Sequence, residues 1–167
     1  MKATARSLFL AALVAICVPG LALCDQTDSR LDALFETLQS SQDEVLLLET
    51  ESEIWDIWYD SGEQQVDDKM EQAAEQLRNG NLAAAGRLYS EVIEMLPEFS
   101  EGWNRRATVR FYQRDYAGSL ADIEETLRLE PRHFGAIWGL GMILGSQRDY
   151  ERAILAFERL LEIKPNA

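Results

Sequence analysis

The stretch YAGSLADIEETLRLEP, residues 116–131, recurs in form as YERAILAFERLLEIKP, residues 150–165. Each stretch follows an Arg-Asp pair and ends in a proline, and Pro97 precedes Pro131 by the interval that separates Pro131 from Pro165. A fixed period of this length is the sequence signature of a repeat array. With the prolines at the thirty-second place, the units are 66–99, 100–133 and 134–167.

Residue size recurs with the same period. The eighth and twentieth places of each unit are small, the twenty-fourth is large and apolar, and the fifteenth to seventeenth form a turn that ends in an apolar residue. In chain order these places hold Ala73, Ala107 and Gly141; Ala85, Ser119 and Ala153; Tyr89, Ile123 and Phe157; and Gly80 to Leu82, Arg114 to Tyr116 and Arg148 to Tyr150. This pattern resembles the tetratricopeptide repeat family over residues 66–167.

The resemblance implies an all-α fold, a solenoid of three helix-turn-helix repeats. The first helix of each repeat, the A helix, is expected over 66–78, 100–113 and 134–147. The second, the B helix, is expected over 82–95, 116–129 and 150–163. A proline closes each B helix because it has no N–H to donate. The resemblance does not fix a partner, since one fold serves many functions.

The segment 1–24 has the pattern of a secretory signal peptide. Lys2 and Arg6 form a basic start, residues 8–18 are apolar, and Pro19 and Gly20 end the apolar run. The run is too short to span a membrane, although an uncleaved anchor helix remains an alternative. The sequence therefore predicts an exported protein, periplasmic if its source is bacterial, with no transmembrane segment after cleavage.

Cleavage after Ala22 or after Cys24 fits the small residues that follow the break. A lipoprotein anchored through Cys24 is a further alternative, although Leu23 stands where a lipobox has a small residue. Because Cys17 and Cys24 are the two cysteines of the chain, no disulfide or thiolate metal site is expected after cleavage.

Residues 25–65 predict an acidic helical hairpin ahead of the repeats. Apolar residues recur at helical spacing over 29–39, and Ser41-x-x-Glu44 has the form of a capping box that opens a second helix. The second helix is expected to end near Tyr59. We expect the hairpin to cap the N-terminal side of the array, because a terminal repeat otherwise exposes its stacking face.

Charge and composition exclude several function classes. The net charge of −13 argues against nucleic acid and anionic membranes as partners. Because His133 is the single histidine, neither a catalytic triad nor a metal site of the usual kind is expected. We expect His133 to lie on the surface or at the entry to a helix. No phosphate loop or hydrolase motif is present. We therefore predict a non-enzymatic protein without cofactor, metal or small-molecule substrate.

The resemblance implies that the A helices line a concave groove. Their second, fifth, sixth, ninth and twelfth places face inward, and Trp, Arg and Met are suited to interfaces. The candidate residues for binding a protein or peptide are Asn104, Arg105, Thr108, Trp138 and Met142. The alternative for Trp138 is that it only packs against its neighbouring helix.

Some members of the family hold the C-terminal carboxylate of a peptide with Lys, Asn and Arg in these grooves. In this sequence the matching places hold Met70, Ala74, Arg105, Gly135 and Gly139. Because Arg105 is the one cation among them, the resemblance does not imply carboxylate binding. At the neighbouring seventh place, Arg106 is expected to form a structural ion pair with Asp122.

A second candidate surface lies on the last helix, where Ile154, Phe157 and Leu161 form one stripe. No polar helix follows Pro165 to cover the stripe, so part of it is expected to be exposed and to dock a partner or a second copy. The sequence thus predicts an exported scaffold or adaptor that binds protein in its groove. The alternative is a structural protein that self-assembles through its array ends, a possible homo-oligomer.

Overall fold

The structure, a computed structural model, describes residues 27–167, and this part of the chain forms eight α-helices and no strand. The expected signal peptide, with both cleavage sites and Cys24, lies outside the described residues. None of the described helices combines the length and apolarity needed to cross a membrane. The helices are α1 Leu31–Ser40, α2 Glu44–Tyr59, α3 Gln64–Arg78, α4 Leu82–Met95, α5 Ser100–Tyr112, α6 Tyr116–Leu129, α7 Phe134–Ser146 and α8 Tyr150–Ile163.

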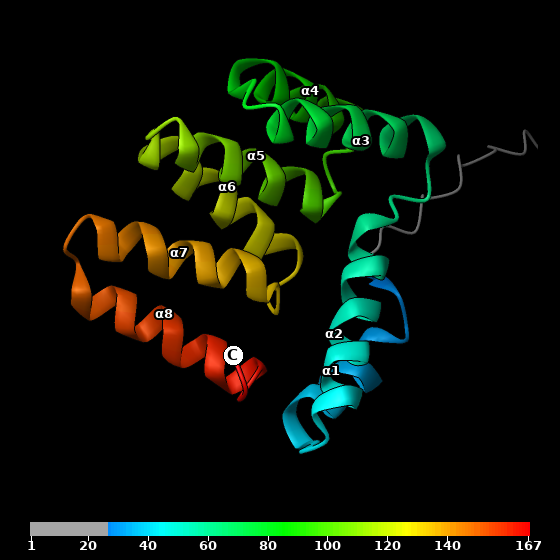
Figure 1. Ribbon diagram of the computed structural model, residues 1–167, viewed down its shortest axis with the longest axis vertical. Coiled ribbons are helices and arrows are strands. Elements are labelled where there is room, and N and C mark those ends of the chain that lie inside the picture. The colour runs from blue at the N-terminus through cyan, green and yellow to red at the C-terminus, as the bar shows by residue number, and fades with distance from the viewer. Residues whose placement is uncertain (1–26) are drawn as a thin grey trace, which may run out of the picture.

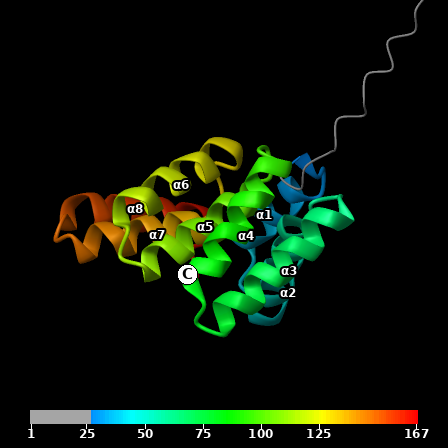
Figure 2. The ribbon, with the colours of Figure 1, turned by 90° about the horizontal axis from the view of Figure 1, so that it is seen from above.

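The helices α3 to α8 form the expected array of A and B helices. Figure 1 shows the pairs α3–α4, α5–α6 and α7–α8 stacked in order, with α1 and α2 standing along one side of the stack. Viewed from above, α3 and α8 lie toward opposite sides of the array (Figure 2). The expected helix bounds are confirmed closely, which follows from turns and caps that recur with the period of the repeats.

Each turn between an A and a B helix uses a residue in the left-handed region. Gly80, Arg114 and Arg148 have φ angles of 76°, 61° and 65°. In the second and third repeats the following aspartate caps the B helix, because Asp115 accepts from the N–H of Gly118 and Asp149 from that of Arg152. The Arg-Asp-Tyr sequence therefore turns the chain, caps the helix and begins it.

The predicted ion pair of the second repeat is confirmed. Arg106 Nη2 lies 2.7 Å from Asp122 Oδ1, and Arg106 Nε donates to Asp122 Oδ2 at 3.0 Å. Arg110 Nη1 also lies 2.8 Å from Asp122 Oδ1, and Arg106 Nη1 donates to Ser90 Oγ of the preceding B helix. The buried carboxylate thus joins two turns of α5 to α6, while Arg106 extends the contact to α4.

The position predicted for the N-terminal hairpin is wrong. The hairpin packs on the third repeat, where α1 and α2 share one apolar core with the start of α7 and the end of α8. Ion pairs of Arg132 with Asp32 and of Lys164 with Glu51 flank this contact. The buried members of this core are Leu31, Phe35, Leu38, Ile54, Ile57, Trp58, Phe134, Ile137, Leu160 and Ile163.

The outer face of the first repeat explains why the hairpin does not cap it. All exposed residues of α3 are polar, so this face offers no apolar surface to bury: Gln64, Gln65, Asp68, Glu71, Gln72, Glu75 and Arg78.

The cap predicted at Ser41 is also wrong. Asp43 accepts from the N–H groups of Val45 and Leu46 and is therefore the N-cap of α2. The Ser41 hydroxyl instead accepts from the N–H of Asp43, just ahead of the helix. The short acidic side chain nearest the first turn thus takes the capping role.

Candidate functional site

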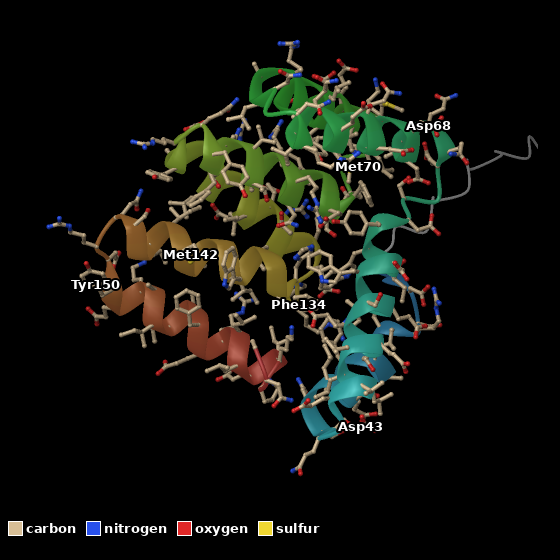
Figure 3. All side chains as sticks on the ribbon, in the orientation of Figure 1. Asp43, Asp68, Met70, Phe134, Met142 and Tyr150 are labelled. Carbon is tan, nitrogen blue, oxygen red and sulfur yellow. The ribbon has the colours of Figure 1, made fainter. Side chains whose placement is uncertain are left out.

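A hollow of about 120 Å³ lies on the inner face of the array between α5 and α7. Thr108 and Tyr112 of α5 and Trp138 and Met142 of α7 form its rim, and none of the described residues that line it is charged. Trp138 is 54% exposed, so packing against the neighbouring helix leaves about half of its surface accessible. Figure 3 shows Met142 toward the end of α7 away from α2, and Phe134 at the end next to α2.

The exposure of Trp138 follows from the glycines around it. Gly135 and Gly139 flank it on the inner face of α7 and also line the hollow. A Cβ at Gly139 would meet Ile123 Cδ1 at 3.5 Å, an ordinary contact, whereas a Cβ at Gly135 would lie 2.7 Å from Trp55 Cη2. Gly135 therefore lets α2 pack closely against α7. Because both neighbours of Trp138 on this face lack a side chain, the indole remains exposed.

Two of the expected binding residues are already engaged inside the fold. Asn104 is buried and donates to Glu101 Oε2 at 2.8 Å, and Arg105 pairs with Glu101 Oε1. The Arg105 guanidinium also lies 4.7 Å from the ring centre of Tyr59 and 5.8 Å from that of Trp55. Burial lowers the pKa of Arg105 to about 10, so it stays charged at neutral pH and is neutralised by Glu101.

Sequence reasoning missed the buried polar cluster around Glu101. His133 Nδ1 accepts from the N–H of Ala136 at 3.2 Å, so His133 Nε2 carries the proton and donates to Glu101 Oε2 at 3.0 Å. His133 is at a helix entry, as one expectation held, but it is fully buried. A glutamate at an inward-facing place, in the repeat that ends with the lone histidine, was the signal available in the sequence.

A second hollow, of about 420 Å³, lies between α3 and α5 on the same face. Its walls include Met70 and Leu77, which are at places that the resemblance predicts to face inward. They also include Tyr59 of the hairpin, which the resemblance does not cover. Its rim carries charges of both signs, from Asp67, Glu71 and Arg78. Burial, and then the charge of Glu101, raises the pKa of the nearby Tyr89 phenol to about 12.

The stripe predicted on α8 divides between two environments. Ile154 and Leu161 are exposed, as expected for part of the stripe. Phe157 points inward, because its ring lies against Gly141, where an added Cβ would meet Phe157 Cε1 at 2.6 Å. Among the described residues, no group of three or more His, Cys, Asp or Glu side chains is arranged to hold a metal ion.

Comparisons with known proteins give relatives for the array. A sequence profile described as tetratricopeptide repeat matches residues 104–167. A TPR repeat-containing protein of Rhizobium etli is 37% identical over 136 residues, which are 81% of this chain and 67% of that protein.

A tetratricopeptide repeat and J domain-containing co-chaperone of Cryptococcus neoformans var. grubii is 31% identical over 77 residues, 46% of this chain and 15% of the relative. Among solved structures, the first TPR of Spaghetti, bound to the HSP90 peptide SRMEEVD, superposes with a TM-score of 0.60 at 21% identity. That match covers 62% of this chain and 82% of the other.

Proposed function

Because this chain belongs to the tetratricopeptide repeat family, we propose that it is a non-enzymatic scaffold that binds a segment of another protein between α5 and α7. The observation that carries the proposal is Trp138, an exposed aromatic side chain at the rim of an apolar hollow. Tryptophan is among the residues that contribute most to interfaces when a partner buries it.

The size of the hollow supports a protein segment over a small-molecule ligand. A volume of about 120 Å³ accommodates one apolar side chain, whereas pockets for drug-sized ligands measure about 300–1,000 Å³. An extended or helical segment could insert one such side chain beside Trp138 and Met142. The hydroxyl of Thr108 is bonded to the carbonyl of Asn104, so the rim contributes mainly apolar contact.

The recognition that we propose does not use a peptide C-terminal carboxylate. The places that could hold one contain Met70, Ala74, Gly135 and Gly139, together with Arg105. Glu101 already neutralises Arg105, and Tyr59 covers its face. A carboxylate at this place would have to displace Glu101, which is fully buried.

A peptide library displayed on phage tests the groove. The full chain is the bait, and selected peptides are measured against variants with matched controls. Tyr112→Ala and Tyr150→Ala remove tyrosines that are 59% and 63% exposed, inside and outside the hollow. Met142→Ala and Met95→Ala remove methionines that are 40% and 39% exposed, again inside and outside.

We expect Trp138→Ala, Tyr112→Ala and Met142→Ala to weaken peptide binding about tenfold or more, because truncating an interface anchor costs about 1–2 kcal/mol or more. Tyr150→Ala and Met95→Ala should leave it unchanged. If all five variants bind selected peptides equally, the binding surface is elsewhere.

We also propose that the protein acts outside the cytoplasm, in the periplasm if its source is bacterial. The basic and apolar pattern of residues 1–24 supports this location. Intact-mass analysis of exported protein should give a start at Leu23 or Asp25. Incorporation of labelled palmitate that depends on Cys24 would instead show a lipoprotein anchored through this cysteine.

A further inference from the structure

The outer face of α8 combines exposed apolar and acidic residues. Ile154, Leu155 and Leu161 are exposed on it, although α8 buries its opposite face against α7 and the hairpin. Glu151, Glu158 and Glu162 are exposed along the same helix. This face is distinct from the groove between α5 and α7.

The repeat register shows what this face is shaped to receive. Shifts by one and by two repeats relate Ile154 to Leu120 and Gly86, Glu158 to Glu124 and Ser90, and Leu161 to Leu127 and Ile93. In α4 these places face the next A helix, α5. A Cβ at Gly86 would lie 3.5 Å from Val109, and Ile93 Cγ1 would lie 3.6 Å from a Cβ at Gly102.

Ser90, which α4 has in the place of Glu158, also contacts α5. Ser90 Oγ accepts from Arg106 Nη1 at 3.2 Å. The helix that covers α4 thus presents Gly102, Arg106 and Val109, which are spaced at i, i+4 and i+7 on one face. The equivalent places of α8 carry a carboxylate instead of Ser90 and an isoleucine instead of Gly86.

We propose that the outer face of α8 binds a basic helix of another protein. The helix has a small residue against Leu161, a Lys or Arg at the i+4 place against Glu158, and an apolar residue at the i+7 place against Ile154. The apolar residue follows from the register, because α6 has Leu120 in the place of Ile154, and α7 presents Ile143 at the i+7 place. The basic residue follows from the charge of Glu158, with Glu151 and Glu162 on the same helix.

A second copy of this chain fits the face less well. Two copies of α8 would bring Glu151, Glu158 and Glu162 toward their own equivalents, and like charges at an interface cost free energy. The net charge of −13 adds long-range repulsion between copies. Both effects favour a basic partner over self-association.

A stapled helical peptide tests the proposal directly. The probe carries Gly, Arg and Val at the spacing of Gly102, Arg106 and Val109, and fluorescence anisotropy measures its binding to the full chain. We expect Leu161→Glu and Glu158→Lys each to weaken binding about tenfold or more. A second probe with Glu in place of Arg should bind Glu158→Lys better than it binds the unaltered chain. The matched control is Glu75→Lys on α3, which makes the same charge change at another exposed site.

Thermal melts confirm first that each variant is folded. Equal binding by the unaltered chain, Leu161→Glu and Glu158→Lys would overturn the proposal, as would failure of the charge-exchanged pair to bind. Light scattering that shows a dimer of the unaltered chain, lost in Leu161→Glu, would assign the face to a second copy instead. Because Trp138→Ala should leave this binding unchanged, failure here is distinguishable from failure of the groove.

Discussion

The indole of Trp58 lies flat on the imidazole of His133, with ring centres 4.1 Å apart and planes 9° from parallel. His133 caps α7 and donates to Glu101 of α5, so this stack joins the hairpin to the second and third repeats. Repeat arrays usually make contacts between neighbouring units only. Here the core that α1 and α2 share with α7 and α8 also holds the first described helix of the chain against the last.

Removing the Trp58 side chain should destabilise the hairpin. Trp58 is fully buried, and Trp58→Ala should lower the free energy of unfolding by about 3–5 kcal/mol. Its indole Nε1 has no hydrogen-bond partner among the described residues, so Trp58→Phe also removes an unpaired donor and should cost much less. Urea denaturation measures both, and Leu48→Ala, at an exposed site of α2, is the control. Equal losses in all three variants would contradict this packing.

The sequence allowed the repeat helices to be predicted because their signals are local. The turn residues Gly80, Arg114 and Arg148 and the closing prolines lie next to the helix ends that they determine. The position of the hairpin depends on contacts between distant residues, such as Asp32 with Arg132 and Glu51 with Lys164. No local pattern encodes such pairs, and the polar face of α3 was the signal against an N-terminal cap.

Arg106 and Asp122 should show coupled effects on stability. Asp122→Ala leaves both Arg106 and Arg110 without their shared carboxylate, and we expect a loss of about 3 kcal/mol. Arg106→Ala leaves Asp122 paired with Arg110, so the loss should be nearer to about 1 kcal/mol. The double variant should cost less than the sum of the two. A double-mutant cycle of Asp122 with Arg30, which pairs with Asp28 and Glu53, should be additive, and an additive Arg106–Asp122 cycle would refute the coupling.

Two glycines of α7 should respond to alanine in opposite directions. A Cβ at Gly141 would lie 2.6 Å from the Phe157 ring, so Gly141→Ala should destabilise the protein by about 1–3 kcal/mol. A Cβ at Gly145 meets no atom of the described residues within 4 Å, so Gly145→Ala should stabilise the helix by about 0.5–1 kcal/mol. Thermal melts compare the two, and a stabilising Gly141→Ala would show that Phe157 has room to move.

The candidate site was predictable only in part. Trp138 and Met142 could be placed on the inner face because a fixed helical register determines which side chains face the groove. The availability of Arg105 could not be predicted in this way, since Glu101 lies within the same helix but Tyr59 and Trp55 come from the hairpin. Whether these residues bind a partner stays a prediction.

Replacing Arg148 by glycine should stabilise the third repeat. Arg148 adopts a φ of 65°, and the left-handed region costs a non-glycine residue about 1–2 kcal/mol. Glycine removes this strain but adds about 0.5–1 kcal/mol of unfolded-chain entropy, so the expected gain is about 0.5–1 kcal/mol. Arg148 is exposed, which limits other effects. Gly80→Ala, the reverse change in the first repeat, should lower the melting temperature; an increase there would contradict the argument.

The phenol of Tyr89 should make stability fall at alkaline pH. Burial is the main cause that raises its pKa from 10 to about 12, so between these values the unfolded chain loses the proton while the folded chain keeps it. A group whose folded pKa is raised stabilises the fold fully below its unfolded pKa, and this contribution is lost as pH rises toward the folded pKa. A shift of this size corresponds to about 2–3 kcal/mol over the whole interval.

Tyr89→Phe isolates this contribution from the other groups that titrate in the same range, including Arg105. We expect the unaltered chain to lose about 2 kcal/mol more stability than Tyr89→Phe between pH 10 and pH 12, measured by urea denaturation at each pH. Tyr112→Phe is the control, because Tyr112 is exposed and its replacement should leave the alkaline loss as it is in the unaltered chain. If Tyr89→Phe loses as much stability at alkaline pH as the unaltered chain, folding does not raise the pKa of the Tyr89 phenol. Its hydroxyl would then be open to solvent through the hollow between α3 and α5.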